Sequence, residues 1–209
     1  MVRVKICGLS EPDTVQAAAR AGADWIGFTF VEASPRYVTV AAAASLLLHV
    51  GDAVPVALLV DPSDADVDAV IGLGIRTLQL HGGEPPDRVD AIKARTGAEV
   101  WKALGVAGPE DLAVAETYGR ADRILLDAKP PADAGRTGGH GDVFDWSVLV
   151  GWEPPGPWML AGGLTPENVR AAIAQTRAPA VDVSSGVERH RGIKSAALIK
   201  EFIAAAKAA

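Results

Sequence analysis

The sequence lacks most of the features that mark secreted, membrane-spanning or nucleic-acid-binding proteins. A single cysteine, Cys7, excludes an internal disulfide and favours a reducing compartment. Acidic residues outnumber basic ones and give a net charge of -6, which argues against nucleic acid or an anionic membrane as a partner. The longest apolar run, 38–50, is rich in alanine and too short to cross a bilayer. We therefore expect a soluble, cytoplasmic protein whose partner is a small molecule.

Two further absences narrow the class of protein. The first residues form a strand pattern broken by Arg3 and Lys5, which is unlike a signal peptide. The histidines are scattered, and no spacing of His, Cys, Asp and Glu indicates a metal site. The composition, 49% apolar and 22% charged, is typical of an ordinary globular protein. We therefore expect a globular protein that binds no metal ion.

A short aliphatic segment followed by an alanine-rich amphipathic segment recurs eight times along the chain. The expected strands are 2–7, 24–30, 54–60, 76–80, 99–104, 123–127, 157–161 and 180–184. The expected helices are 12–21, 40–50, 64–72, 86–96, 109–119, 144–150, 166–175 and 194–207. Strands that alternate with helices form right-handed βαβ units with parallel pairing, and eight such units close a (β/α)8 barrel. No linker interrupts the pattern, so we expect one α/β domain, a TIM barrel over 1–209.

An open, doubly wound parallel sheet is the main alternative fold. That fold usually carries a G-x-G-x-x-G phosphate fingerprint in its first strand-to-helix turn, and residues 7–10 carry none. One long segment, 128–142, is rich in proline, glycine and aspartate and lies between the sixth strand and the sixth helix. Because loops of this length in a compact barrel are usually functional and often serve as lids, we expect this one to be functional.

Polar or flexible residues follow nearly every expected strand. In a barrel the loops after the strands converge on one face, where active sites lie. We therefore expect one site at this face, built from the strand tips, which carry Cys7, Ser34-Pro35-Arg36, Asp61, His81, Asp127, Gly162-Gly163 and Ser184-Ser185-Gly186.

Cys7 and Asp127 are the two candidates for proton transfer. Cys7 ends the first strand on the same face as Lys5, whose positive charge is expected to lower the pKa of the thiol. Asp127 ends an apolar strand, where desolvation favours the protonated carboxyl and work as a general acid. Each residue also has a structural interpretation: a lone buried cysteine often packs as a small apolar group, Asp127 can cap the following loop, and Lys5 can neutralise Asp182 on the eighth strand.

The last two strand tips, 162–163 and 184–186, have the composition of a phosphate cradle. Glycines allow backbone N–H groups to approach an anion, and Ser184 and Ser185 add hydroxyls at the start of an expected short helix, whose dipole favours phosphate. The loops after the seventh and eighth strands are the recurrent phosphate site of such barrels. Tight turns explain either glycine segment alone, but their joint occurrence favours phosphate.

Arg36 and His81 are the remaining candidates for ligand binding. The planar guanidinium of Arg36 suits a carboxylate, although a solvated surface arginine fits the sequence nearly as well. His81 either hydrogen-bonds the ligand or holds its loop, and the sequence does not distinguish between these roles.

These residues lie in motifs whose order and spacing resemble the phosphoribosylanthranilate isomerase family of tryptophan biosynthesis over the whole length of the chain. The resemblance implies a (β/α)8 barrel and a cofactor-free Amadori rearrangement. The substrate would be N-(5-phosphoribosyl)anthranilate and the product 1-(2-carboxyphenylamino)-1-deoxyribulose 5-phosphate. The motifs are segments 5–9, 34–38, 78–82, 126–127, 138–141, 144–146, 160–164, 166–169 and 182–188.

The resemblance also implies roles for individual residues. Asp127 would be the general acid and Cys7 the general base, while Arg36 would bind the anthranilate carboxylate. The phosphate would be held by glycines and serines, namely Gly139, Gly141, Gly162, Gly163, Ser184, Ser185 and Gly186. Three positions depart from the family pattern: His140 stands between the loop-six glycines, Asp61 replaces a common asparagine, and Ser195 replaces an aspartate at the expected cap of the last helix.

Three other functions fit parts of the sequence. A Schiff-base aldolase on the same barrel needs a lysine nucleophile, and Lys102 on the fifth strand is the candidate. A barrel that binds a phosphorylated ligand without catalysis is a second alternative, since fold does not fix function, but the joint presence of Cys7 and Asp127 speaks against it. A shared-substrate isomerase that also serves histidine synthesis would carry paired aspartates at the first and sixth tips, which Cys7 disfavours.

Overall fold

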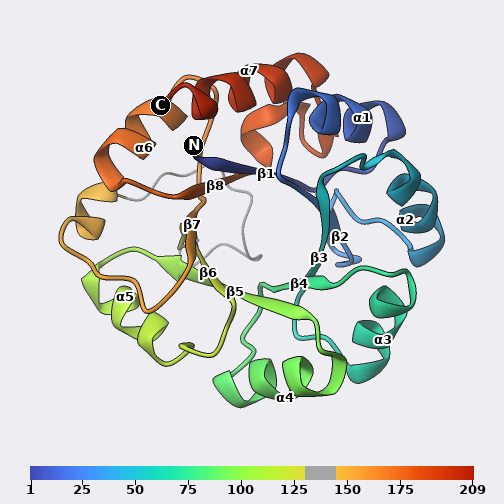
Figure 1. Ribbon diagram of the computed structural model, residues 1–209, viewed down its shortest axis with the longest axis horizontal. Coiled ribbons are helices and arrows are strands. Elements are labelled where there is room, and N and C mark those ends of the chain that lie inside the picture. The colour runs from blue at the N-terminus through green and yellow to red at the C-terminus, as the bar shows by residue number, and fades with distance from the viewer. Residues whose placement is uncertain (130–144) are drawn as a thin grey trace.

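Eight parallel strands close into one barrel, and helices surround it as a ring (Figure 1). The computed structural model describes residues 1–129 and 145–209. The strands are β1 (Arg3–Cys7), β2 (Trp25–Thr29), β3 (Val54–Leu59), β4 (Thr77–Leu80), β5 (Glu99–Val106), β6 (Arg123–Ala128), β7 (Trp158–Leu160) and β8 (Ala180–Val183). Because β1 pairs in parallel with both β2 and β8, the predicted (β/α)8 barrel is confirmed and the open sheet is wrong.

The helices follow the strands in the expected order. They are α1 (Pro12–Ala21), α2 (Val40–Leu46), α3 (Asp64–Gly72), α4 (Pro86–Thr96), α5 (Pro109–Glu116), α6 (Val169–Thr176) and α7 (Ala196–Lys207). A 3-10 turn, η1 (Leu47–His49), extends α2. The helix expected from 166 begins at Val169, because the side chain of Asn168 accepts a hydrogen bond from the Thr165 N–H at 2.8 Å and holds the preceding turn.

The prediction of a sixth helix over 144–150 is wrong for the part that the structure describes. Only a 3-10 turn, η2 (Trp146–Leu149), forms there, and Asp145 caps it by accepting the Ser147 N–H at 2.9 Å. Gly151 follows with a φ of 79°, and the proline-rich segment 153–157 comes next. Left-handed backbone and prolines without an N–H cannot continue a helix, so the apolar pattern yields a single turn.

A small hairpin between β8 and α7 was not expected from the sequence. A one-turn 3-10 helix, η3 (Ser185–Val187), follows β8 as predicted. The chain then forms β9 (Glu188–His190) and β10 (Ile193–Lys194), which pair antiparallel. The last helix therefore begins after the hairpin, capped by Ser195, whose hydroxyl accepts the Leu198 N–H at 3.4 Å.

Side chains that alternate along the strands form two separate apolar clusters. Val4 and Ile6 belong to the large apolar cluster that the barrel shares with its helices, whereas Cys7 lines a pocket at the barrel mouth. A second cluster packs around Trp25 and Trp101, whose rings meet edge to face with centroids 5.3 Å apart near the amino ends of their strands. The period-two pattern of a strand thus gives each strand one set of side chains packed against the helices and another set that faces the opposite way, apolar in the cluster around Trp25 and Trp101 and polar where Cys7 lines the pocket.

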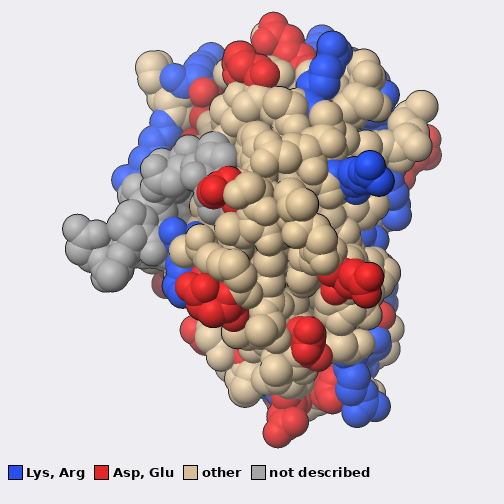
Figure 2. All heavy atoms as spheres, turned by 90° about the vertical axis from the view of Figure 1, so that its left-hand side faces the viewer, with Lys and Arg blue, Asp and Glu red and all other residues tan. Residues whose placement is uncertain are grey.

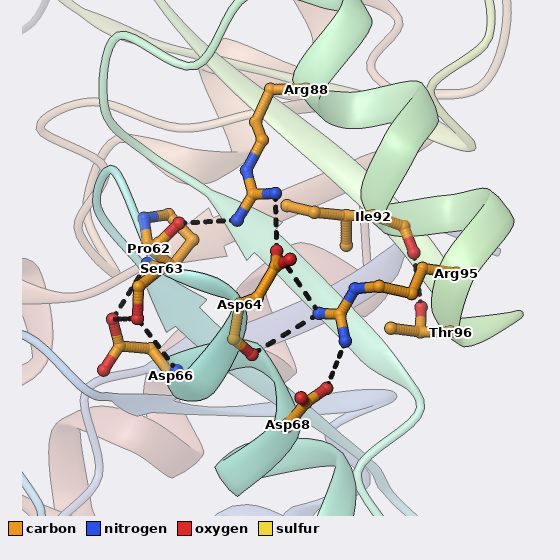
Figure 3. A network of polar contacts seen from close by, with 9 residues as sticks. All are labelled: Pro62, Ser63, Asp64, Asp66, Asp68, Arg88, Ile92, Arg95 and Thr96. Atoms are coloured by element: carbon orange, nitrogen blue, oxygen red, sulfur yellow. Dashed lines mark hydrogen bonds and ion pairs between the residues drawn. The ribbon is translucent and has the colours of Figure 1, made fainter.

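An exposed ion-pair network joins α3 to α4 (Figure 3). Arg88 donates to the Asp64 carboxylate at 2.7 Å and to the Pro62 carbonyl at 2.7 Å. Arg95 donates to Asp68 and lies 3.6 Å from the Asp64 carboxylate. The side chains of Asp64 and Asp68 remain 59% and 61% exposed. These contacts tie the segment after β3 to the next helix from the solvent side.

Charges of both signs mark the side of the molecule shown in Figure 2. Lys and Arg lie mainly around the margin of this face, among Asp and Glu, while uncharged residues fill much of its middle. None of the helices in the described ranges has the length and apolar character needed to span a membrane.

Candidate active site

A pocket opens at the carboxyl ends of the strands, where the sequence predicted a site. Its lining comes from the tips of β1 to β4, β6 and β8 and from the loops that follow them. Cys7, Arg36, His81, Asp127 and Ser184, all predicted site residues, line it. The remaining lining residues are Thr29, Val31, Ser34, Leu58, Val60 and Asp182.

Cys7 lies buried at the base of this pocket, 4% exposed. It stands opposite Gly27 on β2, and a Cβ at Gly27 would come within 3.0 Å of the Cys7 sulfur and 3.1 Å of Lys5 Nζ. The Lys5 charge lowers the pKa of the thiol, as expected, but it does not decide the net direction of the shift. Burial raises the pKa of Cys7, and the Lys5 charge only partly opposes it.

Lys5 forms the ion pair that the sequence allowed. Its ammonium lies 2.9 Å from the Asp182 carboxylate, and the two residues stand side by side in the β1–β8 register. Burial alone would lower the pKa of Lys5, but Asp182 and Cys7 outweigh burial and raise it. The interior beneath the pocket therefore holds a permanent cation next to the thiol.

Asp127 makes two contacts, of which one is the loop cap expected from its structural interpretation. One carboxylate oxygen accepts the Ala128 N–H at 2.9 Å, which is the expected loop cap. The other lies 3.3 Å from His81 Nε2, and His81 Nδ1 lies 2.9 Å from the Gln79 amide nitrogen. Gln79 and Asp127 therefore lie on the two sides of the His81 ring. His81 thus borders the pocket and lies directly beside the Asp127 carboxyl.

Arg36 is not the solvated surface arginine that the sequence permitted, because its side chain is 11% exposed. Its Nε and Nη2 donate to the two oxygens of Glu188 at 2.5 and 3.0 Å. Burial would raise the pKa of Glu188, but the Arg36 fork, Lys194 and the Gly192 N–H outweigh it and lower the pKa to about 2. Arg36 therefore borders the pocket with one of its edges already bound to a carboxylate.

The tips of β7 and β8 are built around close backbone approaches. Gly162 and Gly163 have φ values of 83° and 61°, and a Cβ at Gly162 would come within 2.5 Å of the Ala128 nitrogen. A Cβ at Gly186 would lie 1.9 Å from the Leu164 carbonyl oxygen. Packing thus explains these glycines without a ligand, and their role in phosphate binding stays a prediction.

Several predicted residues lie outside the described ranges. Gly139, Gly141 and His140 are among them, as is most of the segment 128–142. The described residues bring no group of three or more His, Cys, Asp or Glu together in a geometry that could hold a metal ion.

Lys102 does not support the alternative of a Schiff-base aldolase. Its ammonium donates to the Gly82 carbonyl at 2.6 Å and to the Glu84 carboxylate at 2.7 Å, and the residue is 2% exposed. Glu84 also accepts the N–H of Asp61, which adopts a φ of 45°. Lys102 is not among the residues lining the pocket in the part of the chain described. Lys102 instead holds two loops together, so it does not serve as the nucleophile that a Schiff-base aldolase would need.

Glu188 and Lys194 are the polar residues that the sequence analysis missed. Lys194 is 4% exposed and donates to Glu188 at 2.9 Å and to the Ser184 carbonyl at 2.8 Å. A signal was present: Glu188 and Lys194 flank Gly192 in a short charged segment after the last strand, a pattern typical of a hairpin turn.

The fold and pocket define a (β/α)8-barrel enzyme with a cysteine and an aspartate at its mouth. The sequence matches the family N-(5'phosphoribosyl)anthranilate (PRA) isomerase over residues 4–205. It is 59% identical to N-(5'-phosphoribosyl)anthranilate isomerase of Hyphomonas neptunium, covering 100% of this chain and 98% of that protein. The protein of the same name from Paracoccus denitrificans is 53% identical, covering 99% and 98%.

Solved structures agree with these sequence matches. The crystal structure of phosphoribosyl anthranilate isomerase from Thermotoga maritima is 37% identical, covers 100% of both chains and gives a TM-score of 0.89. A phosphoribosyl anthranilate isomerase in complex with reduced 1-(o-carboxyphenylamino)-1-deoxyribulose 5-phosphate is 35% identical, covers 100% of both chains and gives a TM-score of 0.87. The chain therefore belongs to the N-(5'-phosphoribosyl)anthranilate isomerase family, and the resemblance seen in its motifs is confirmed.

Proposed function

We propose that this chain converts N-(5-phosphoribosyl)anthranilate to 1-(2-carboxyphenylamino)-1-deoxyribulose 5-phosphate in tryptophan biosynthesis, with Cys7 and Asp127 as its base and acid. One observation carries the assignment of roles: Cys7 on β1 and Asp127 on β6 line the same pocket. A base and an acid in one pocket are what an aldose-to-ketose rearrangement needs. The protein would act in the cytoplasm as one barrel domain.

In this mechanism Asp127 starts the reaction as a general acid. It protonates the ring oxygen of the ribose, the ring opens, and the nitrogen lone pair forms an iminium. His81, which is within 3.3 Å of Asp127, holds the carboxyl toward the pocket. The iminium is an electron sink within the substrate, so the following proton abstraction requires no cofactor in this mechanism.

Cys7 completes the reaction as a general base. As thiolate it removes the proton from C2′ of the sugar, and the resulting enolamine tautomerises to the ketone. Burial that raises the pKa of the thiol also makes its thiolate a stronger base once formed. Lys5 and the iminium place positive charge near the sulfur when it ionises, and both favour the anion.

The other predicted site residues bind the substrate. Arg36 receives the anthranilate carboxylate at the rim. The phosphate is held at the tips of β7 and β8 by Gly162, Gly163, Ser184, Ser185 and Gly186, together with Gly139 and Gly141.

The test is the loss of phosphoribosylanthranilate fluorescence with purified protein and no added metal. Turnover by the wild type is expected, and Asp127→Asn should remain folded and bind ligand but not turn over, because an amide cannot deliver the proton. A destabilised Asp127→Asn variant with normal turnover per folded molecule would limit Asp127 to its contact with Ala128. Wild-type protein that leaves the substrate unchanged would overturn the proposed function itself.

A further inference from the structure

Glu188 is a buried carboxylate at the edge of the proposed active site, and four donors converge on it. Arg36 contributes Nε at 2.5 Å and Nη2 at 3.0 Å, Lys194 contributes Nζ at 2.9 Å, and Gly192 contributes its backbone N–H at 2.9 Å. The Glu188 side chain is 5% exposed. This set of partners leaves little freedom for the carboxylate or for the guanidinium that it binds.

We propose that Glu188 is a positioning residue that fixes which edge of Arg36 faces the substrate, and that it thereby sets the selectivity of the pocket for carboxylate-bearing ligands. The proposal rests on the proposed function, in which Arg36 receives the anthranilate carboxylate. Glu188 acts through Arg36 and makes no contact with the reacting atoms.

The hydrogen bonds between Arg36 and Glu188 determine which N–H donors of the guanidinium are left to bind a ligand. A guanidinium has five N–H donors, and Glu188 takes the one on Nε and one on Nη2. Both N–H donors of Nη1 and the second donor of Nη2 remain free of Glu188. A ligand carboxylate therefore binds the terminal Nη1 and Nη2 groups of the guanidinium. Because the fork is already oriented, binding does not need to order a long flexible side chain.

The stem of Arg36 is also held in place. Its backbone N–H donates to the Ser34 hydroxyl at 3.2 Å. Gly8, with a φ of 74°, leaves room for the stem, since a Cβ there would lie 2.5 Å from Arg36 Cδ. Gly8 directly follows Cys7, so Arg36 crosses the tip of β1 beside the proposed base.

Lys194 extends the cluster to the neighbouring strand tip. Its ammonium donates to Glu188 and also to the carbonyl and hydroxyl of Ser184, at 2.8 and 3.1 Å. The Ser184 hydroxyl in turn donates to the Cys7 carbonyl at 3.2 Å. One buried carboxylate therefore connects the carboxylate-binding arm, the tip of β8 and the tip of β1. The hairpin β9–β10 supplies both Glu188 and Lys194.

A ligand pair that differs only in the carboxyl group separates positioning from general support. We would use reduced 1-(o-carboxyphenylamino)-1-deoxyribulose 5-phosphate and its counterpart without the carboxyl group, and measure both affinities by calorimetry. Glu188→Gln is expected to weaken binding of the carboxylate ligand about 10-fold or more and to change the other affinity less than about 3-fold. The amide places its NH2 group against donors of Arg36 and Lys194, so the fork loses its orientation.

Two further variants keep the test decisive. E188Q combined with K194M removes one negative and one positive charge and leaves no unpaired lysine. Because K194M alone already removes the contacts with Ser184, the double variant is compared with K194M and should show the same selective loss relative to it. Asp68→Asn removes a carboxylate that binds an arginine on the surface, and both affinities should match the wild type.

The outcomes separate the inference from the function that it rests on. An equal loss for both ligands, or no loss for either in the folded double variant, would overturn the role of Glu188 while wild-type turnover still stands. A wild type that fails to turn over phosphoribosylanthranilate would overturn the proposed function, and the role of Glu188 with it.

Discussion

The chain uses arginine–carboxylate pairs in two settings that differ mainly in exposure. On the surface, Asp68 and Arg95 form part of the network between α3 and α4, and Asp68 is 61% exposed (Figure 3). At the active-site edge, Glu188 and Arg36 form a fork in which the carboxylate is 5% exposed. Exposed pairs contribute at most about 1 kcal/mol, whereas a buried pair must overcome a large loss of hydration.

This difference in exposure gives the two kinds of arginine–carboxylate pair different roles. The surface network stabilises the contact between two helices a little and tolerates replacement. The buried cluster of Glu188, Arg36 and Lys194 gains little net stability over apolar packing, but breaking it leaves charges without partners. The cluster therefore matters more for the orientation of Arg36 than for the stability of the fold. Its position at the edge of the pocket is consistent with this role.

The largest effect is expected from a change that touches neither network. Cys7→Ser should lower turnover about 10²- to 10⁴-fold, because a hydroxyl is a much weaker base than a thiolate and general-base catalysis has this size. The Cys7 carbonyl, which accepts from the Ser184 hydroxyl, is unchanged by this substitution, so stability and ligand affinity should remain close to wild type. Turnover within a factor of two of wild type, measured by substrate fluorescence, would remove Cys7 from the mechanism.

The second largest effect breaks the buried cluster. Glu188→Gln should reduce the free energy of unfolding by about 3 kcal/mol or more at pH 7, because Arg36 and Lys194 lose the charge that compensates them. Urea unfolding followed by circular dichroism gives the value. A loss below about 1 kcal/mol would place this pair in the same class as the surface pairs.

The pH dependence of the same variant sharpens the comparison. The pKa of Glu188 is lowered to about 2 in the folded protein from an ordinary value near 4.5. The unfolded chain therefore binds a proton before the folded one does, so the stabilisation is present above pH 4.5 and is lost as pH falls toward 2. The pH-dependent part of the stabilisation has a size of about 3 kcal/mol.

The measurement is the difference in unfolding free energy between wild type and Glu188→Gln across this range. We expect the difference to shrink steadily as the pH is lowered. A difference that stays constant from pH 6 to pH 3 would contradict the ionic role of Glu188.

The smallest effect belongs to the surface network. Asp68→Asn should change the free energy of unfolding by less than about 1 kcal/mol, and added salt should reduce even this difference, because exposed charges are screened. Thermal unfolding at low and high salt provides the test. A loss of several kcal/mol that salt does not alter would show that the exposed network is more than a surface contact.

The fold and the two central site residues were predictable because strand alternation is local. The pattern of 2–7 places Cys7 on the strand face away from Val4 and Ile6, and Asp127 stands at the end of an apolar strand. Both residues line the pocket at the barrel mouth. The eightfold repeat then fixes the closure of the sheet. These inferences need no information about distant contacts.

The features that were missed depend on distant contacts. Arg36 and Glu188 are 152 positions apart, and nothing near either residue in the sequence indicates the pair. The net direction of the Cys7 pKa shift depends on whether burial or Lys5 dominates, which only the packed barrel decides. At 144–150 the apolar pattern suggested a helix, but Gly151 and the prolines after it permit one turn.

Gly27 has a consequence for how this sequence can change over generations. A methyl group there would meet the Cys7 sulfur at 3.0 Å and the Lys5 ammonium at 3.1 Å, although Gly27 itself has no polar atom beyond its backbone. Drift at position 27 is therefore limited by Lys5 and Cys7 of the adjacent strand, including the Cys7 backbone, and not by the conformation of β2. We expect random mutagenesis under selection for activity to leave this position as glycine, while it accepts many residues at Asp68 on the surface.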